Sequence, residues 1–201
     1  MAIEILITWA VQIMASLGYM GLFLLMILES MIFPIPSEAV MPFAGFLVAN
    51  GTFTFWKVFL FANLGTLVGS LISYYIGLKG GRLFLEKYGK YFLVHKDDVA
   101  WSESFFQKNG EKAIFIARLI PVVRHVISVP AGIAKMNFKR FILYTLLGGI
   151  VWNTFLLFVG IKLEKHWTVI SEYTKTLDVI VVFFIFFGIG FFVWKHMKRK
   201  K

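Results

Sequence analysis

Four charged side chains lie inside apolar stretches of this sequence, where a charge needs a specific reason to be present. Glu29 and Glu38 begin and end the segment ESMIFPIPSE, and Arg118 and Arg124 lie in RLIPVVRH. A charge at the depth of a bilayer core costs roughly 2.5–3.5 kcal/mol on insertion scales, so such residues face one another, water or a charged ligand. We therefore expect the four side chains to converge on one polar site.

The two arginines are suited to a phosphate group, because a guanidinium donates two parallel hydrogen bonds to it. Broken helices beside them would add helix N-termini, which also attract anions. The alternative is that the four charges form two ion pairs that fix one arrangement of the chain. His125 follows Arg124 and is either a hydrogen-bonded histidine or, together with Glu29 and Glu38, a candidate for proton coupling.

The patterns of an enzyme or a metal site are missing from the sequence. It has no cysteine, no metal-ligand cluster, no nucleophile triad and no glycine-rich phosphate loop. None of the histidines lies in the turn that histidine-nucleophile phosphatases need; they are His95, His125, His166 and His196. We therefore expect a protein that is not an enzyme, with no catalytic residue, no metal and no cofactor.

The composition is that of an integral membrane protein. The 201 residues are 59% hydrophobic and 18% aromatic, and the mean hydropathy of +0.77 is far above that of a soluble domain. A net charge of +10 would suggest nucleic acid in a soluble protein. Here it is better explained by basic cytoplasmic loops, so the expected partner is the lipid bilayer and no nucleic acid. A homo-oligomer is compatible with the pattern.

The first element that positions these charges is a broken hairpin. Apolar arms over 19–32 and 39–50 are each about 20 Å or shorter as helices, near half of a bilayer. Pro34 and Pro36 disfavour helix between the arms. This pattern predicts a re-entrant hairpin, which enters and leaves the membrane on one face. Gly45, in the second arm, permits a close approach of another backbone.

A second hairpin is predicted over 113–137, and it carries the arginines. Pro121 interrupts its apolar pattern, and Pro130 with Gly132 breaks its return arm. The two hairpins therefore share a design and carry opposite charges. Two structurally similar elements in one chain are typical of transporters that are built from repeats.

The distribution of basic residues orients these elements. Lys and Arg concentrate in 79–112 (seven), 135–140 (three) and the tail from 195 (five), whereas 50–57 and 161–178 hold four. The positive-inside rule places the first group in the cytoplasm. The hairpins then enter from opposite faces, which predicts an inverted repeat with its site near the midplane. We expect a multi-pass protein of the cytoplasmic membrane with a cytoplasmic C-terminus.

The predicted fold class is an all-α integral membrane protein with an inverted-repeat architecture. Its parts are an N-terminal amphipathic or short membrane helix over 1–17, a transport domain over 18–165, a C-terminal transmembrane helix over 178–197 and a basic tail over 198–201. The transport domain divides into a first hairpin over 18–50, a span over 54–78, cytoplasmic surface helices over 79–112, a second hairpin over 113–137 and a span over 138–161.

These motifs resemble the DedA family of membrane proteins, also called the SNARE-associated Golgi or VTT-domain family. The resemblance covers about residues 15–165 and is carried by ESMIFPIPSE together with FIARLIPVVRHVISVPAG. It implies two facing re-entrant hairpins. It also implies that Glu29, Glu38, Arg118 and Arg124 correspond to the functional charged residues of the family.

The resemblance further implies that the protein moves lipids across a membrane. Bacterial members of the family are implicated in the transport of undecaprenyl phosphate, others in that of phospholipids, and some depend on the proton-motive force. The expected function is a flippase that returns undecaprenyl phosphate for reuse in cell-envelope synthesis, with a lipid phosphate and protons as partners. The alternatives are a phosphatidylethanolamine-type scramblase or flippase, and a proton-dependent antiporter.

Overall fold

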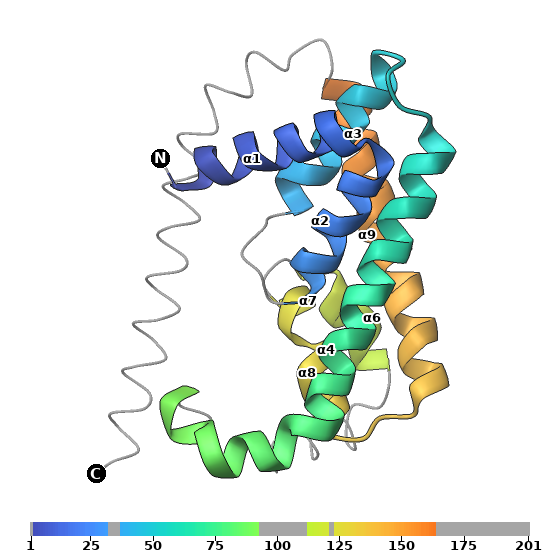
Figure 1. Ribbon diagram of the computed structural model, residues 1–201. Helices are drawn as coiled ribbons and strands as arrows, with labels where there is room; N and C mark the ends of the chain where they lie inside the picture. Colours follow the sequence, from blue (N-terminus) through green and yellow to red (C-terminus); the bar gives the residue numbers. More distant parts are fainter. Residues whose placement is uncertain (1, 32–36, 93–111, 121–122, 164–201) are drawn as a thin grey trace, which may run out of the picture.

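The computed structural model describes residues 2–31, 37–92, 112–120 and 123–163, and the backbone in these ranges is helical without a strand (Figure 1). The predicted all-α class is therefore confirmed for this part of the chain. The helices are α1 (Ala2–Leu17), α2 (Tyr19–Ser30), α3 (Ser37–Ala49), α4 (Phe55–Phe92), α6 (Lys112–Arg118), α7 (Val123–Val126), α8 (Ser128–Ile133) and α9 (Phe138–Leu163).

Helices α4 and α9 are long and apolar enough to cross a bilayer. The apolar parts, Phe55–Gly80 and Phe138–Leu163, have 26 residues each, which corresponds to about 39 Å of helix. Large apolar side chains are exposed along α9, namely Leu143, Leu147, Val151, Phe155 and Phe158. The buried face of α4 instead carries the polar residues Asn63, Thr66, Ser70 and Ser73. An exterior of this kind suits lipid, and polar groups inside a span face the interior of the bundle.

The short helices fill the space beside the two long ones from opposite ends. Helices α2 and α3 lie at one end of the bundle, and α6, α7 and α8 lie at the other (Figure 1). Each group divides its contacts between the long helices: α2 packs on α4 and α3 on α9, while α6 packs on α9 and α8 on α4. Helix α2 also contacts α7, so the two groups meet in the middle of the bundle.

Helix α1 lies within residues 1–17, for which an amphipathic or short membrane helix is predicted. It lies across the bundle, over α2 and α3 (Figure 1). Gly18 connects it to α2 with a φ of 58°, a conformation that glycine adopts without strain. Several predicted features fall outside the described residues: Pro34, Pro36, Pro121, the helix over 178–197 and the tail over 198–201.

Helix α4 is longer than the predicted span over 54–78, because it continues to Phe92. Residues 79–92 contain no proline that would end it. The last part of α4 turns away from the axis of its first part (Figure 1), and the pair Gly80 and Gly81 in this region is typical of a helix bend. The segment predicted as separate surface helices over 79–112 thus begins as a continuation of the span.

Helix α3 meets α9 through glycines that bring the two backbones together. A Cβ atom added at Gly45 would fall on the carbonyl oxygen of Leu157. Conversely, a Cβ atom added at Gly160 would fall on the carbonyl oxygen of Pro42 and 2.6 Å from its Cα. We call this contact the α3–α9 seam. Larger residues would separate the two helices there.

Helix α8 meets α4 in the same manner at the other end of the bundle. A Cβ atom at Gly132 would fall on the carbonyl oxygen of Tyr74, and one at Gly77 on that of Val129. We call this contact the α4–α8 seam. In each seam, one glycine comes from a short helix and the other from a long helix.

The α3–α9 seam gives a stability prediction. Gly160→Ala should destabilise the protein by roughly 1–3 kcal/mol, because the added methyl group meets backbone atoms that cannot rotate away. Gly149→Ala on the same helix is the matched control, since its Cβ would lie no closer than 3.5 Å to Thr66 Cγ2. Thermal unfolding of both variants in detergent measures the difference. Equal melting temperatures would contradict the close contact.

Candidate functional site

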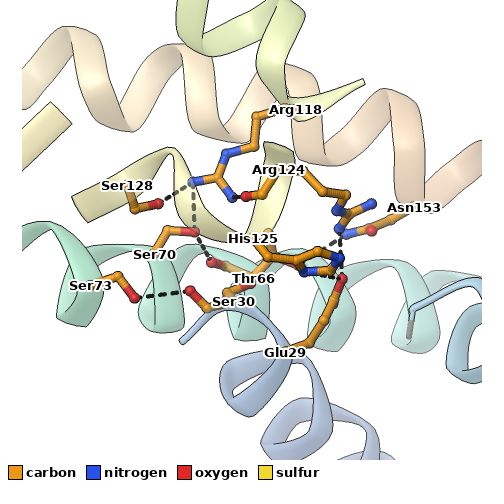
Figure 2. A network of polar contacts seen from close by, with 10 residues as sticks. All are labelled: Glu29, Ser30, Thr66, Ser70, Ser73, Arg118, Arg124, His125, Ser128 and Asn153. Atoms are coloured by element: carbon orange, nitrogen blue, oxygen red, sulfur yellow. Dashed lines mark hydrogen bonds and ion pairs between the residues drawn. The ribbon is translucent and has the colours of Figure 1, made fainter. Parts of the chain in front are cut away.

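A buried ion pair joins the two groups of short helices where α2 meets α7. Glu29 is next to the last residue of α2, and Arg124 is the second residue of α7. Nη2 of Arg124 lies 3.1 Å from Oε1 of Glu29, and the two side chains are 2% and 1% exposed (Figure 2). The contact lacks the alignment of a hydrogen bond, and neither carboxylate oxygen accepts one from a described residue. The attraction between Arg124 and this carboxylate is thus mainly Coulombic.

The second arginine, Arg118, is held in a different way. It ends α6 and is also 2% exposed. Its Nη2 donates to the hydroxyl oxygens of Ser128 at 2.7 Å and Ser70 at 2.9 Å (Figure 2), and the hydroxyl oxygen of Thr145 is 3.5 Å away. Its Nη1 donates to the main-chain carbonyl of Arg124 at 3.1 Å. One guanidinium therefore fixes the backbone that carries the other.

His125 and Glu38 lie on the more accessible side of the ion pair. Nδ1 of His125 is 3.5 Å from Oε1 of Glu29, and its side chain is 21% exposed. Glu38 is in the first turn of α3 and is exposed. Its carboxylate is close enough to His125 for a Coulombic attraction. The structure therefore brings Glu29, Arg118, Arg124 and His125 together, with Glu38 at the edge of the group.

The interruption between α7, which carries Arg124, and α8 has a local cause. Helices α7 and α8 are separated only at Ile127, although the sequence predicted a break at Pro130 itself. Pro130 is inside α8. Its ring has no N–H and crowds the carbonyl four residues earlier, at Val126, so the helix is interrupted before the proline. The break lies nearer to Arg124 than predicted.

Several buried polar atoms around the ion pair have no hydrogen-bond partner among the described residues. They are Oε2 of Glu29, Nε of Arg118, Nη1 of Arg124, Oγ of Ser37, Nε1 of Trp152 and Oδ1 of Asn153. The ring of Trp152 also faces the Arg124 guanidinium, 5.4 Å from its centroid. A buried polar atom without a partner costs about 1–3 kcal/mol. Such atoms gathered at one place indicate a site that a further polar group completes.

The neutral polar residues beside the charges were not predicted from the sequence. They are Ser70, Ser73, Ser128, Thr145 and Asn153. Asn153 Nδ2 donates to Asn63 and Thr66, each at 3.2 Å. The available signal was the spacing of the polar residues in the first span, at 63, 66, 70 and 73, which is one face of a helix. Within the described part of the chain, no group of three or more His, Cys, Asp or Glu residues could hold a metal ion.

An apolar exterior, broken helices and a buried charged site define a membrane protein of the transporter type. The family profile of the VTT domain matches residues 35–162. The chain belongs to this family, the DedA family, and the resemblance found in the sequence is confirmed.

Curated relatives cover most of the chain. Undecaprenyl phosphate transporter A of Bacillus subtilis (strain 168) is 38% identical over 88% of this chain and 87% of its own length. The protein of the same name in Staphylococcus aureus (strain NCTC 8325 / PS 47) is 29% identical over 94% of this chain and 96% of its own. A protein named alkaline phosphatase-like from Lactococcus lactis subsp. cremoris (strain MG1363) is 32% identical over 94% of this chain and 93% of its own. No solved structure matches the chain.

The ion pair predicts a non-additive effect of mutations. Glu29→Leu and Arg124→Leu should each destabilise the protein by about 3–5 kcal/mol, because each leaves one buried charge alone. The double variant should be more stable than the sum of the two effects implies, since neither charge remains. Chemical unfolding in detergent measures all three. Glu38→Leu combined with Arg124→Leu is the control, and additive effects of the Glu29 and Arg124 changes would exclude the pair.

Proposed function

We propose that the protein is a flippase that returns undecaprenyl phosphate from the outer to the inner leaflet of the cytoplasmic membrane. The apolar tail stays in the bilayer, and the phosphate passes the buried site. The lipid is transported without chemical change, so no residue acts as a nucleophile or a metal ligand. The names of the relatives in B. subtilis and S. aureus support this choice of substrate.

The observation that carries the proposal is the pair of unpartnered guanidinium donors. Nε of Arg118 and Nη1 of Arg124 are both buried and make no hydrogen bond within the described chain. Two guanidiniums face one carboxylate, so the three groups together have one positive charge in excess. A phosphate group offers the oxygen acceptors and the negative charge that both donors lack.

The contacts of the helices support the predicted architecture of two facing re-entrant hairpins in an inverted repeat. In each half, the first arm packs on the span that follows it, and the second arm packs on the span of the other half. Gly45 and Gly132 occupy corresponding places in the second arms, and Gly160 and Gly77 in the spans. The distribution of basic residues supports a cytoplasmic position for the start of α9 and the C-terminus, with the start of α4 outside.

The ion pair suggests how a proton is coupled to the lipid. When the site is empty, ionised Glu29 neutralises Arg124. When a phosphate takes its place on Arg124, two negative groups lie close together, so binding a proton to Glu29 becomes favourable. His125, near both Glu29 and Glu38, offers a route for that proton. Lipid and proton are then carried and released together on the cytoplasmic side.

A second candidate substrate is a zwitterionic phospholipid. Oε2 of Glu29 is buried without a hydrogen-bond partner among the described residues and is an acceptor suited to an ammonium group. A phosphatidylethanolamine headgroup would place its phosphate on the arginines and its amine on Glu29. A transport assay with both undecaprenyl phosphate and phosphatidylethanolamine distinguishes the two candidates.

Transport in proteoliposomes tests the function. The parent protein should exchange fluorescent undecaprenyl phosphate between leaflets faster than labelled phosphatidylethanolamine, without release of inorganic phosphate. Arg124→Lys keeps the positive charge and loses the planar guanidinium that donates two parallel hydrogen bonds. The apparent affinity for undecaprenyl phosphate should therefore fall by about tenfold at every pH. Faster exchange of phosphatidylethanolamine would favour the second candidate, and release of phosphate would indicate a phosphatase.

The pH profile of transport tests the role of the carboxylates. Glu29→Gln imitates the protonated acid, so it should retain binding and make transport independent of pH over roughly pH 5.5–8.5. Glu38→Gln is the comparison, because Glu38 is exposed and lies at the edge of the site. If both variants keep the pH profile of the parent, the carboxylates are structural and proton coupling fails.

Cysteine labelling tests the orientation, and the absence of native cysteines makes single-cysteine variants simple to prepare. Thr52 and Lys139 are exposed near the starts of α4 and α9 and are suitable positions for labelling. The neighbouring Phe53 is only 9% exposed, so a cysteine there would react poorly with the reagent. A membrane-impermeant maleimide should label Thr52→Cys only from outside and Lys139→Cys only from the cytoplasm. Labelling of both from one side would contradict the inverted repeat.

A further inference from the structure

The environment of Arg118 differs from that of Arg124 in a way that the proposed function does not by itself require. Arg124 has an acidic partner, Glu29. Among the described residues, Arg118 has four acceptors and none of them is a carboxylate: three are the hydroxyls of Ser70, Ser128 and Thr145, and the fourth is a main-chain carbonyl. The three hydroxyls come from α4, α8 and α9 and surround Nη2, and we call them the hydroxyl cradle.

The hydrogen bonds around Ser70 fix the direction of its lone pairs. Its Oγ donates its single proton to the carbonyl of Thr66 at 2.6 Å. The oxygen can therefore act only as an acceptor toward Arg118. Ser73, one turn further along α4, is equally buried, but it donates to the carbonyl of Ser30 at 2.9 Å and does not contact Arg118 in any of these bonds.

Neutral acceptors have a specific consequence for a buried cation. A carboxylate beside Arg118 would hold it and also cancel its field. Hydroxyl dipoles satisfy its N–H groups and leave its net charge in place. The same bonds involve Nη1 and Nη2, so among the described residues Nε is the only nitrogen of Arg118 without a hydrogen-bond partner.

We propose that Ser70, Ser128 and Thr145 are positioning residues that hold Arg118 in place without neutralising it, so that its charge and its Nε donor stay available to the bound anion. Through Nη1 and the Arg124 carbonyl, the cradle also sets the position of Arg124. The inference rests on the proposed function and deepens it, by adding the residues that make the site attractive to a phosphate group.

Inorganic phosphate is a probe that does not depend on lipid transport. An anion that binds the folded protein raises its melting temperature, and at a given concentration the rise is larger when the affinity is higher. For the parent in detergent, added phosphate should raise the melting temperature. Added chloride at the same ionic strength should not. Ser70→Ala and Ser128→Ala should each weaken phosphate binding by about tenfold, as the loss of a hydrogen bond to a charged group implies. Thr145→Val should have a smaller effect because its contact is long.

Three matched variants separate positioning from a general loss of stability. Ser128→Thr keeps the hydroxyl and should retain the phosphate-dependent shift, and Ser73→Ala removes a buried hydroxyl outside the cradle and should also retain it. Ser128→Asp gives Arg118 an acidic partner and should abolish the shift, whereas the neutral Ser128→Asn should weaken it only as much as Ser128→Ala.

Two results would overturn the inference: a parent whose melting temperature does not respond to phosphate, or cradle variants whose response equals that of the parent despite a lower melting temperature. Failure of undecaprenyl phosphate transport with the expected phosphate responses would instead refute only the proposed lipid. The two ideas are thereby tested separately.

Discussion

The structure depends on the burial of two guanidinium groups and one carboxylate inside a helical bundle with an apolar exterior. A buried charge without a partner destabilises a fold far more than a lost apolar contact does. Every element near the centre contributes to solving this problem. Helix α2 ends so that Glu29 reaches Arg124, and the long helices present hydroxyl and amide groups on their inner faces. Helix α6 ends at Arg118, and α7 begins one residue before Arg124, so both arginines lie at helix ends near the centre.

The arginines have different roles within this arrangement. Arg118 contacts four elements through neutral groups and resembles a fixed part of the scaffold. Among the described residues, Arg124 has one ionic partner, one aromatic neighbour and one nitrogen, Nη1, without a hydrogen-bond partner. A carboxylate that is not aligned for hydrogen bonds is easier to displace than one held by a bidentate contact. The exchange of partners proposed for transport is therefore expected at Arg124.

The sequence predicted the parts of the site that are governed by strong, local rules. Charges in apolar segments are costly, so Glu29, Arg118 and Arg124 were identifiable without a structure. The arms of the first hairpin were also predictable, and α2 and α3 begin and end within two residues of the expected bounds. Three features were not predictable in this way. The end of α4 has no strong stop signal, the break before Pro130 is displaced by the geometry of its ring, and the hydroxyl cradle assembles residues from three separate helices.

The two glycine seams have a consequence for motion. Helices that interlock through large side chains must change rotamers before they can shift, and such surfaces favour one packed arrangement. In the seams, backbone lies on backbone at Gly45 and Gly160 on one side and at Gly77 and Gly132 on the other. Smooth surfaces of this kind can slide by small shear displacements without repacking. The two seams therefore permit small shear displacements on either side of the charged centre. At the centre itself, hydrogen bonds hold Arg118 in a fixed direction.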